Sequence, residues 1–300
     1  MGEERLQKNR ECKNPLPLHL MVLPGIILVL IFSYGPMVGI AIAFQKFIPA
    51  KGLFGSKWIG LGNFRYVMDL PNTLQILWNT IFISFMKIVA GLVVPLTVAL
   101  LLNEVTQPSI KKTIQTTIYL PHFLSWVILG GILIDVLSPS EGIVNKLIVA
   151  LGGKAVYFLG DNNWFPYTLV ITDVWKEFGF GTIVYLAAIT SIDPTLYDGA
   201  NRWQQTWHVT LPGMKSIIVL MAVLSLGNVL NAGFEQVFNL YSPQVYESGD
   251  IIDTFVYRIG LIDAQFGVAT AVGLFKSVVS FIFITISYFL AYKIADYRIF

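Results

Sequence analysis

Residues 197–212 have the sequence YDGANRWQQTWHVTLP, a polar and aromatic stretch that lies between two long apolar segments. Apolar residues recur through this region at alternating intervals of four and three, which is the period of a helix. They are Leu196, Ala200, Trp203 and Trp207. An amphipathic helix of this kind lies on a membrane surface, with its tryptophans at the level of the lipid headgroups. We therefore predict a short interfacial helix within residues 193–212.

Both ends of this predicted helix are marked by proline. Asp193-Pro194 is a good helix start, because an acidic residue caps the first turn and proline suits the first helical position. Pro212 is expected to end the helix and to begin the next apolar segment. Gly199 lies inside the pattern, where glycine costs about 1 kcal/mol relative to alanine. Either another protein surface approaches closely at Gly199, or the chain makes a kink or turn there between two short helices.

The composition of the chain indicates that lipid is its solvent. Of 300 residues, 55% are hydrophobic and only 13% are charged, whereas soluble domains carry about 25% charged residues. The net charge of +2 gives no indication of a nucleic-acid partner. Cys12 is the single cysteine, so an internal disulfide framework is excluded.

Six apolar runs are long enough to cross a bilayer, which takes about 20 residues in a helix. These predicted spans are 18–44, 77–103, 114–137, 166–190, 212–232 and 267–292. Pro121 interrupts the third of them and Asn228 the fifth. The sequence thus predicts an all-α membrane protein with six transmembrane helices, a tail at residues 1–17 and a single transmembrane domain at 18–300.

The loops between the predicted spans indicate the orientation of the chain. With the N-terminus inside, Lys and Arg are in modest excess in the inner segments, as the positive-inside rule requires. The loop at 233–266 is acidic and falls on the outer side. Both termini and the 193–212 segment are therefore predicted to be cytoplasmic. A second short amphipathic helix is predicted at 142–151, on the outer surface.

The residues after Gly199 resemble a known signature. Gly199, nine further residues and then Val209-x-Leu211-Pro212 are similar to the second half of the "EAA" motif, G-x9-I-x-L-P, of permease subunits of binding-protein-dependent ABC importers. Three other stretches resemble the sugar-importer branch of that family, in the same order along the chain. They are WIGLGNF (58–64), YLPHFLSW (119–126) and DVWKEFGFGTIVYLAAITSIDP (173–194). The chain is most similar to the LplB-like oligosaccharide and polysaccharide type of the MalF-like family.

One departure from the family pattern concerns the E-A-A residues themselves. The chain passes from Asp193-Pro194-Thr195-Leu196-Tyr197 directly to Asp198-Gly199-Ala200, as if five residues were deleted. In the alternative alignment, Asp193-Pro194-Thr195 takes the place of E-A-A. Either way the acidic residue of the motif is weakened or lost, which bears on the strength of coupling.

The resemblance implies that 193–212 is the cytoplasmic coupling segment of a type I ABC importer permease, which binds an ATP-hydrolysing subunit. The residues it assigns to ATPase coupling are Asp198, Gly199, Ala200, Arg202, Trp203, Leu211 and Pro212. Of these, Asp198 and Arg202 are candidates for salt bridges across that interface. The chain lacks a G-x4-G-K-[ST] phosphate loop, and its three histidines are too scattered for a metal site. We expect no catalytic, cofactor or metal residues in it, and ATP and magnesium on partner subunits.

The resemblance also implies the partners and the location. These are a second homologous permease subunit, two ATPase subunits, an extracytoplasmic solute-binding protein, a carbohydrate substrate and the lipid of the bacterial cytoplasmic membrane. The expected function is a transport subunit, not an enzyme. The alternative is a proton-coupled secondary sugar transporter that acts without an ATPase; internal inverted repeats would favour it, and none is visible.

Charged and polar residues inside the predicted spans are candidates for function, because they are costly in lipid. In the fourth span, Asp173 and Lys176 either form an intrahelical salt bridge or line a sugar path with neighbouring aromatic rings. In the fifth, Asn228 and Asn231 are one turn apart and either hold helices together, at about 0.6 kcal/mol per hydrogen bond, or contact sugar. The predicted substrate pathway consists of Asp173, Trp175, Lys176, Glu177, Phe178, Asn228, Asn231 and Glu235.

Two further lysines, Lys87 and Lys276, lie deep in the second and sixth spans. Three roles remain open for them: a pair with Asp135, a pair with acids of a partner permease, or binding of an acidic sugar.

Overall fold

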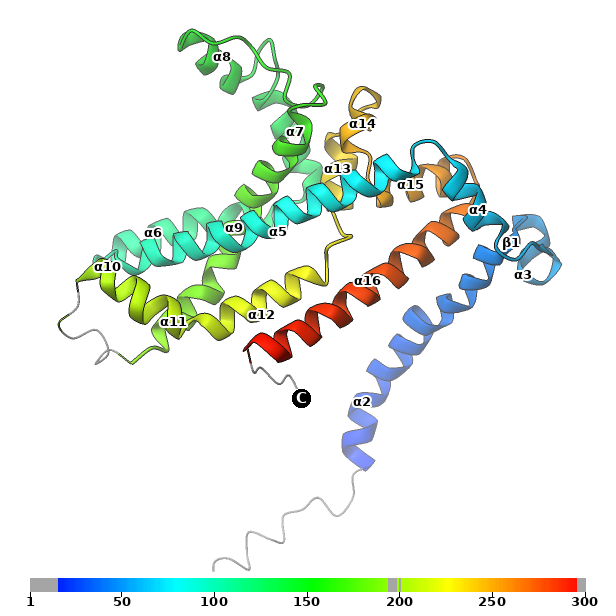
Figure 1. Ribbon diagram of the computed structural model, residues 1–300, viewed down its shortest axis with the longest axis horizontal. Coiled ribbons are helices and arrows are strands. Elements are labelled where there is room, and N and C mark those ends of the chain that lie inside the picture. Colours follow the sequence, from blue (N-terminus) through cyan, green and yellow to red (C-terminus); the bar gives the residue numbers. More distant parts are fainter. Residues whose placement is uncertain (1–15, 194–198, 200, 296–300) are drawn as a thin grey trace, which may run out of the picture.

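The computed structural model describes residues 16–193, 199 and 201–295, and these are predominantly helical (Figure 1). The exception is a small antiparallel pair of strands, β1 (Gln45–Lys46) and β2 (Lys57–Trp58). The described chain contains three helical stretches long and apolar enough to cross a membrane, or five if each of two bent helix pairs counts as one span. The all-α architecture agrees with the sequence, while the count of six spans remains a prediction.

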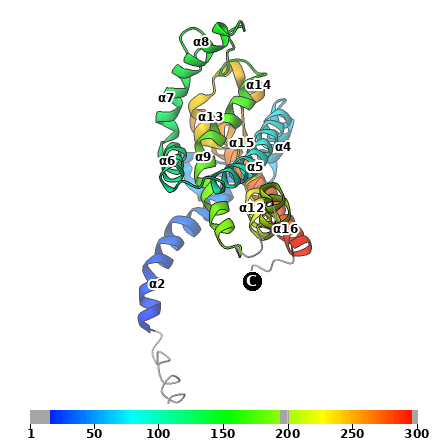
Figure 2. The same ribbon diagram turned by 90° about the vertical axis from the view of Figure 1, so that its left-hand side faces the viewer.

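The three continuous stretches correspond to the first, second and sixth predicted spans. The first is α2 (Leu16–Val29) with its extensions η1 (Leu30–Tyr34) and η2 (Gly35–Phe44). The others are α5 (Thr73–Asn103) and α16 (Phe266–Ala295). Within the first stretch, η2 packs against α16, whereas the N-terminal part of α2 diverges from the other helices in both views (Figures 1 and 2).

The fourth predicted span is a single helix, α9 (Phe165–Thr190), which packs along α5. Unlike the three stretches above, it carries three charged residues, Asp173, Lys176 and Glu177, and it does not count among the apolar helices.

The third predicted span is not one straight helix. Helix α6 (Pro108–Tyr119) runs into the short segment η4 (Leu120–Phe123), and α7 (Trp126–Val136) then leaves at 104°. Pro121 lies in η4, and proline removes a backbone donor from a helix. Ser125 caps the new helix by accepting a hydrogen bond from the backbone N–H of Ile128 at 3.4 Å. The span predicted at 114–137 is therefore sharply bent, close to Pro121, the residue that interrupts it in the sequence.

The fifth predicted span is also broken. Helical residues run through α10 (Arg202–Gln204), η6 (Gln205–Thr210) and α11 (Leu211–Gly213), and α12 (Lys215–Leu226) follows at an angle of 59°. Pro212 thus lies within the helical stretch and does not end it; the bend comes at Met214. Helix α12 ends at Leu226 and does not continue to residue 232 as predicted; residues 227–230 form a turn and 231–233 a loop.

Shorter elements complete the fold. They are η3 (Pro49–Lys51), α3 (Gly52–Gly55), α4 (Gly62–Asp69), α8 (Ile143–Ala150), α13 (Phe234–Leu240), η7 (Pro243–Val245), α14 (Tyr246–Gly249), α15 (Ile252–Tyr257) and η8 (Arg258–Ile262). Helix α8 confirms the short helix predicted at 142–151. It lies at the end of an arm that begins with α7 (Figures 1 and 2).

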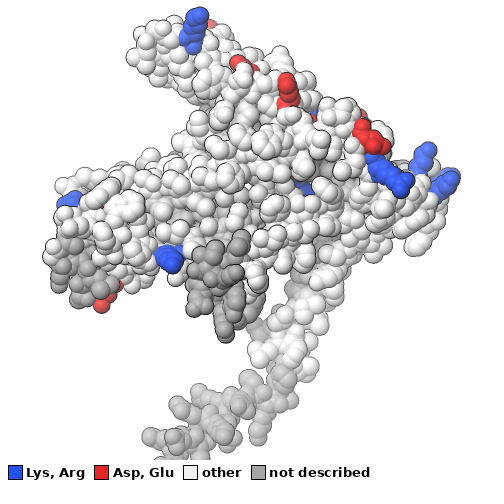
Figure 3. All heavy atoms as spheres, viewed as in Figure 1, with Lys and Arg blue, Asp and Glu red and all other residues white. Residues whose placement is uncertain are grey.

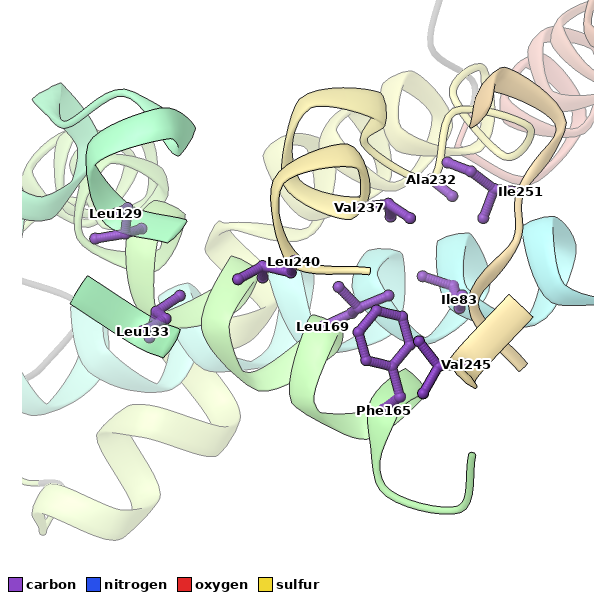
Figure 4. Close-up of a cluster of buried hydrophobic side chains, with 10 residues drawn as sticks. All are labelled: Ile83, Leu129, Leu133, Phe165, Leu169, Ala232, Val237, Leu240, Val245 and Ile251. Atoms are coloured by element: carbon purple, nitrogen blue, oxygen red, sulfur yellow. The ribbon is translucent and has the colours of Figure 1, made fainter. Parts of the chain in front are cut away.

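The largest buried cluster lies where α5, α7, α9 and α13 meet. Figure 4 shows Phe165 and Leu169 of α9 packed against Ile83 of α5 and Val245, with α13 above them. Its members are Ile83, Leu129, Leu133, Phe165, Leu169, Ala232, Val237, Leu240, Val245 and Ile251. This core fixes α13 against α9, which determines where the polar residues of both helices lie.

Asn79 of α5 connects this core to a segment far away in sequence. Its side chain is buried, and Nδ2 donates to the backbone oxygens of Glu247 at 2.9 Å and Asp250 at 3.2 Å. We expect Asn79→Leu to destabilise the protein by about 1–3 kcal/mol, because buried carbonyls lose a partner. The measurement is the melting temperature in detergent. Asn103→Leu, at an exposed position of the same helix, should leave it unchanged.

Candidate functional site

A buried lysine lies at the centre of the polar residues. Nζ of Lys87 in α5 donates to Oδ1 of Asp173 in α9 at 3.2 Å, to the backbone oxygen of Ala232 at 2.7 Å, and to Oε1 of Gln236 in α13. Gln236 in turn donates from Nε2 to the Leu169 carbonyl and to Thr172, both at 2.8 Å. The ammonium group thus has three acceptors, one in α9, one in the loop before α13 and one in α13. The intrahelical salt bridge between Asp173 and Lys176, one of the two alternatives left open by the sequence, is not formed, because Asp173 pairs with Lys87.

Gly233 allows this network to form. Its φ of +89° is a conformation that other residues rarely adopt. A Cβ atom at this position would lie 2.9 Å from Nζ of Lys87. The non-helical segment that ends at Gly233 therefore places the Ala232 carbonyl and Gln236 within hydrogen-bond distance of Lys87 Nζ. Within the described chain Lys87 pairs with Asp173 and not with Asp135, which answers one of the questions that the sequence left open.

A second ionic cluster lies at the bend between α6 and α7. Nζ of Lys176 contacts Oε1 of Glu177 at 2.7 Å and the backbone oxygen of His122 at 3.1 Å. The other oxygen of Glu177 lies 2.7 Å from Nδ1 of His122. The His122 ring stacks on Phe180 with 4.2 Å between the ring centroids. Lys176 is buried while Glu177 is 43% exposed at its side chain, so the cluster opens to the surface through the carboxylate.

The structure brings together only part of the predicted pathway in α9. Asp173, Lys176 and Glu177 lie on one face, because a helix advances about 100° per residue. Trp175 lies on the opposite face and is 45% exposed. Phe178 is partly buried between these two faces.

The predicted residues of the fifth span lie outside a helix. Asn228 and Asn231 belong to the turns that follow α12, where the N–H of Asn231 donates to the Asn228 carbonyl at 2.8 Å. Their expected place on one helical face is therefore wrong, because the helix ends at Leu226. Asn228 is exposed and donates to the Leu224 carbonyl at 3.4 Å. Glu235 is exposed in the first turn of α13.

Asn231 does line a groove of about 960 Å³, formed by η2, α15, α16 and the start of α13. Its polar lining includes an ion pair between Nζ of Lys276 and Oδ1 of Asp253 at 2.5 Å. Its aromatic lining includes Phe234 and Tyr257. The groove thus combines a cation, an anion, an amide and two rings.

Sequence reasoning missed Asp253, Phe234 and Tyr257. All three belong to the acidic loop at 233–266, which the sequence places outside the spans as a whole. The spacing of Asp253 and Tyr257 by four residues, the distance of neighbours on a helical face, was the available signal.

In the segment expected to couple to an ATPase, the described helix begins at Arg202. Asn201 caps the helix: Asn201 Oδ1 accepts from the Gln204 N–H at 2.9 Å, and Gln204 Oε1 accepts from the Asn201 N–H at 3.0 Å. Gly199 precedes the cap with a φ of +79°. It therefore does not lie inside a helix, and the turn is the explanation that the structure favours. Asp198 and Ala200 lie outside the described residues, as do residues 194–197.

The remaining coupling residues lie beside the C-terminal end of α5. Arg202 Nη1 forms an ion pair with Glu104 Oε2 at 3.0 Å, so it has a partner within its own chain. Trp203 and Trp207 meet edge to face at 5.8 Å and are 72% and 53% exposed. Leu211 is partly buried and lines, with both tryptophans, a groove of about 550 Å³ against α5. Pro212 is exposed.

The charge distribution agrees with a protein embedded in lipid. On the face shown in Figure 3, Lys, Arg, Asp and Glu gather toward the ends of the molecule, and the surface between them is nearly free of charge. Within the described residues, no group of three or more potential ligands could hold a metal ion.

Comparisons with known proteins give close relatives over almost the whole chain. It is 43% identical over 284 residues to the polygalacturonan/rhamnogalacturonan transport system permease protein YteP of Bacillus subtilis (strain 168), covering 93% of this chain and 88% of that protein. It is 40% identical over 281 residues to protein LplB of the same organism, with coverage of 92% and 88%. No protein-family model matches the chain.

Two crystal structures are similar as well. One is of a bacterial ABC transporter involved in the import of the acidic polysaccharide alginate; the TM-score is 0.87 at 39% identity, covering 97% of this chain and 99% of that one. The other is of a bacterial alginate ABC transporter in complex with an alginate pentasaccharide-bound periplasmic protein, with a TM-score of 0.86 at 38% identity and coverage of 95% and 97%.

Proposed function

Since the chain belongs to the permease subunits of bacterial ABC importers for oligosaccharides and polysaccharides, we propose that it carries an acidic oligosaccharide across the bacterial cytoplasmic membrane. The observation that supports this most is the similarity to an alginate importer over 97% of the chain. As a permease of this family the chain is a transport subunit and not an enzyme. The relatives named for polygalacturonan and alginate favour a substrate whose sugar units carry carboxylates.

The energy for transport comes from other subunits in this proposal. Two ATPase subunits bind ATP and magnesium, a second homologous permease completes the pathway, and an extracytoplasmic solute-binding protein delivers the sugar. A similar transporter crystallised with its sugar-bound periplasmic protein supports the last of these partners. In this proposal both termini lie in the cytoplasm and residues 18–300 belong to one transmembrane domain, whose first helix, α2, begins two residues earlier than predicted, at Leu16.

The groove between η2, α15 and α16 is the part of the pathway that we assign to this chain. Asn231, of the predicted pathway residues, lines it together with the Lys276–Asp253 pair. Lys276 gives it a cation for a sugar carboxylate and Asn231 an amide for hydroxyl groups. Glu177 and His122 present a second polar surface at the bend of the third span. Lys87 and Asp173 serve mainly to hold α5, α9 and α13 together, and Lys176 holds α9 against η4 through the His122 carbonyl.

Reconstitution tests the proposal directly. The chain is expressed with its candidate partner permease, ATPase and binding protein, placed in liposomes, and assayed for uptake of labelled galacturonate oligomers. We expect uptake that requires ATP inside and the binding protein outside. Uptake by this chain alone, driven by a proton gradient and indifferent to ATP, would instead establish the secondary transporter.

The turn at Gly199 gives a prediction for coupling. Gly199→Ala forces an L-residue into the left-handed region, which costs roughly 1–2 kcal/mol. We expect the sugar transported per ATP hydrolysed to fall severalfold, because the turn that orients residues 201–213 toward the ATPase shifts. The measurement is uptake and ATP hydrolysis in the same proteoliposomes.

Gly152→Ala is the matched control for this prediction. Gly152 also has a positive φ, +85°, and a Cβ at either glycine would meet no atom within 4 Å. It lies after α8, at the tip of the arm that begins with α7 and apart from α10 (Figure 1). An equal loss of coupling in both variants would show that backbone strain in general, and not the position of Gly199, is responsible.

A further inference from the structure

Five aromatic rings form a continuous row along α13 and the elements beside it. Phe234 and Phe238 stack on one face of α13, with 5.4 Å between ring centroids. Tyr257 of α15 contacts both of them, at 5.7 and 4.8 Å. Tyr241 follows Phe238 at 6.4 Å, and Tyr246 follows Tyr241 at 5.1 Å. We call Phe234, Phe238, Tyr241, Tyr246 and Tyr257 the aromatic row.

The aromatic row connects two separate cavities. Phe234 and Tyr257 line the groove of about 960 Å³ that holds the Lys276–Asp253 pair. Tyr241 lines another cavity, of about 370 Å³, between α7 and the end of α13. Phe238 lies between them and is 39% exposed. The row therefore leads from one polar cavity to the other with part of its surface uncovered.

Polar groups accompany both ends of the row. The cavity at Tyr241 contains Asp135 and a second tyrosine, Tyr157. Burial, followed by the neighbouring Tyr246, raises the pKa of Tyr241 to about 12.

Tyr246 is held in place from behind by a charged group. The Arg258 guanidinium lies 4.6 Å from the centroid of its ring. Arg258 is itself bound to the buried carboxylate of Asp250. An arginine fixed on one face of a tyrosine keeps the ring in a single orientation, which is what a binding surface requires.

We propose that the aromatic row is a series of subsites on which the rings of an oligosaccharide stack as it passes from the cavity at Tyr241 to the groove at Lys276. This inference rests on the proposed function. Sugar rings present apolar C–H faces to aromatic rings and hydroxyl groups to the polar residues beside them. A row that served only as core would be covered, whereas Phe238 is exposed, and within the described chain Tyr241 alone of the five rings packs against a buried cluster.

A stacking surface predicts a dependence on substrate length. A disaccharide occupies at most two rings of the row at once, while a pentasaccharide spans most of it. Loss of the central ring should therefore weaken transport of the longer sugar more. One aromatic contact corresponds to about a 3- to 10-fold change in apparent affinity.

The experiment compares Phe238→Leu, which keeps an apolar side chain but loses the flat ring, with Phe238→Trp, which restores one. Uptake of galacturonate dimers and pentamers is measured in proteoliposomes with the complete transporter. We expect Phe238→Leu to raise the apparent KM for the pentamer about 3- to 10-fold and for the dimer much less, and Phe238→Trp to be close to the natural protein. Phe281→Leu, on the exposed face of α16, is the matched control and should change neither.

Three results would overturn the inference. One is an unchanged KM in Phe238→Leu, another is an equal loss for dimer and pentamer, and the third is a failure of Phe238→Trp to restore pentamer uptake. The last two would assign Phe238 a packing role. Failure of the natural protein to take up any galacturonate oligomer, with ATP and binding protein present, would instead refute the proposed function, so the two failures are distinguishable.

Discussion

Replacement of Lys87 by methionine is expected to destabilise the protein by about 3–5 kcal/mol, because it removes one partner of a buried ion pair. The side chain of Lys87 is only 9% exposed and that of Asp173 25%. Without the ammonium group, the Asp173 carboxylate, the Ala232 carbonyl and Gln236 Oε1 all lose the same donor. These three groups come from α9 and from the segment around α13, so the loss should loosen both at once. The measurement is the melting temperature of the assembled transporter in detergent.

A double variant separates the ion pair from the bulk of the lysine. Replacing Asp173 by leucine together with Lys87→Met removes both charges and leaves no carboxylate without a partner, so we expect it to recover part of the lost stability. Two losses that simply add would show that the Lys87–Asp173 contact is not what stabilises this region. Lys276→Met provides a comparison, since Lys276 is 21% exposed in the groove and should cost less.

Gly179→Ala should disrupt the packing of α6 against α9. A Cβ atom at Gly179 would lie 1.9 Å from the backbone oxygen of Ile118 and 2.5 Å from its carbonyl carbon. Backbone atoms cannot move aside as a flexible side chain can, so α6 must shift together with the bend that follows it. Overpacking of this kind costs about 1–3 kcal/mol and occasionally more. We expect a lower melting temperature and reduced recovery of the assembled transporter.

Gly91→Ala makes the same chemical change in a helix of the same type. A Cβ at Gly91 in α5 would meet no atom within 4 Å, and alanine favours a helix by about 1 kcal/mol over glycine. This variant should be as stable as the natural protein or more so. If Gly179→Ala behaved like Gly91→Ala, the close contact between α6 and α9 would be absent from the protein in solution.

The features that the sequence predicts well are those that depend on neighbouring residues. The apolar runs give α5, α9 and α16, the pattern at 142–151 gives α8, and Pro121 signals the bend between α6 and α7. Gly199 is the opposite case. Its neighbours fit a helical period, but Asn201 caps the helix that begins at Arg202, so Gly199 lies before that helix and not inside it. Periodicity records which face a residue would occupy, not whether the helix continues through it.

Contacts between residues that are distant along the chain could not be predicted from the sequence. Asp173 has Lys176 three positions away, within reach on a helix, yet it pairs with Lys87 from another helix. That choice depends on how α5 and α9 pack, which no local pattern encodes. The aromatic row escaped notice for the same reason, since Tyr257 approaches Phe238 only after the chain has turned back through α14 and α15. Family resemblance supplied the function and most of the topology but not these pairings.

The separation of Lys87 from its partner also has a consequence in time. Asp173 lies 86 positions further along the chain, and ribosomes add about 5–20 residues per second. About 4–17 s therefore pass between the synthesis of the lysine and that of its carboxylate. During this interval a lone lysine in the middle of a membrane helix costs about 2.5–3.5 kcal/mol. The apolar residues of α5 must outweigh that cost, so this helix carries in its own sequence the means to enter the bilayer before its ion pair exists.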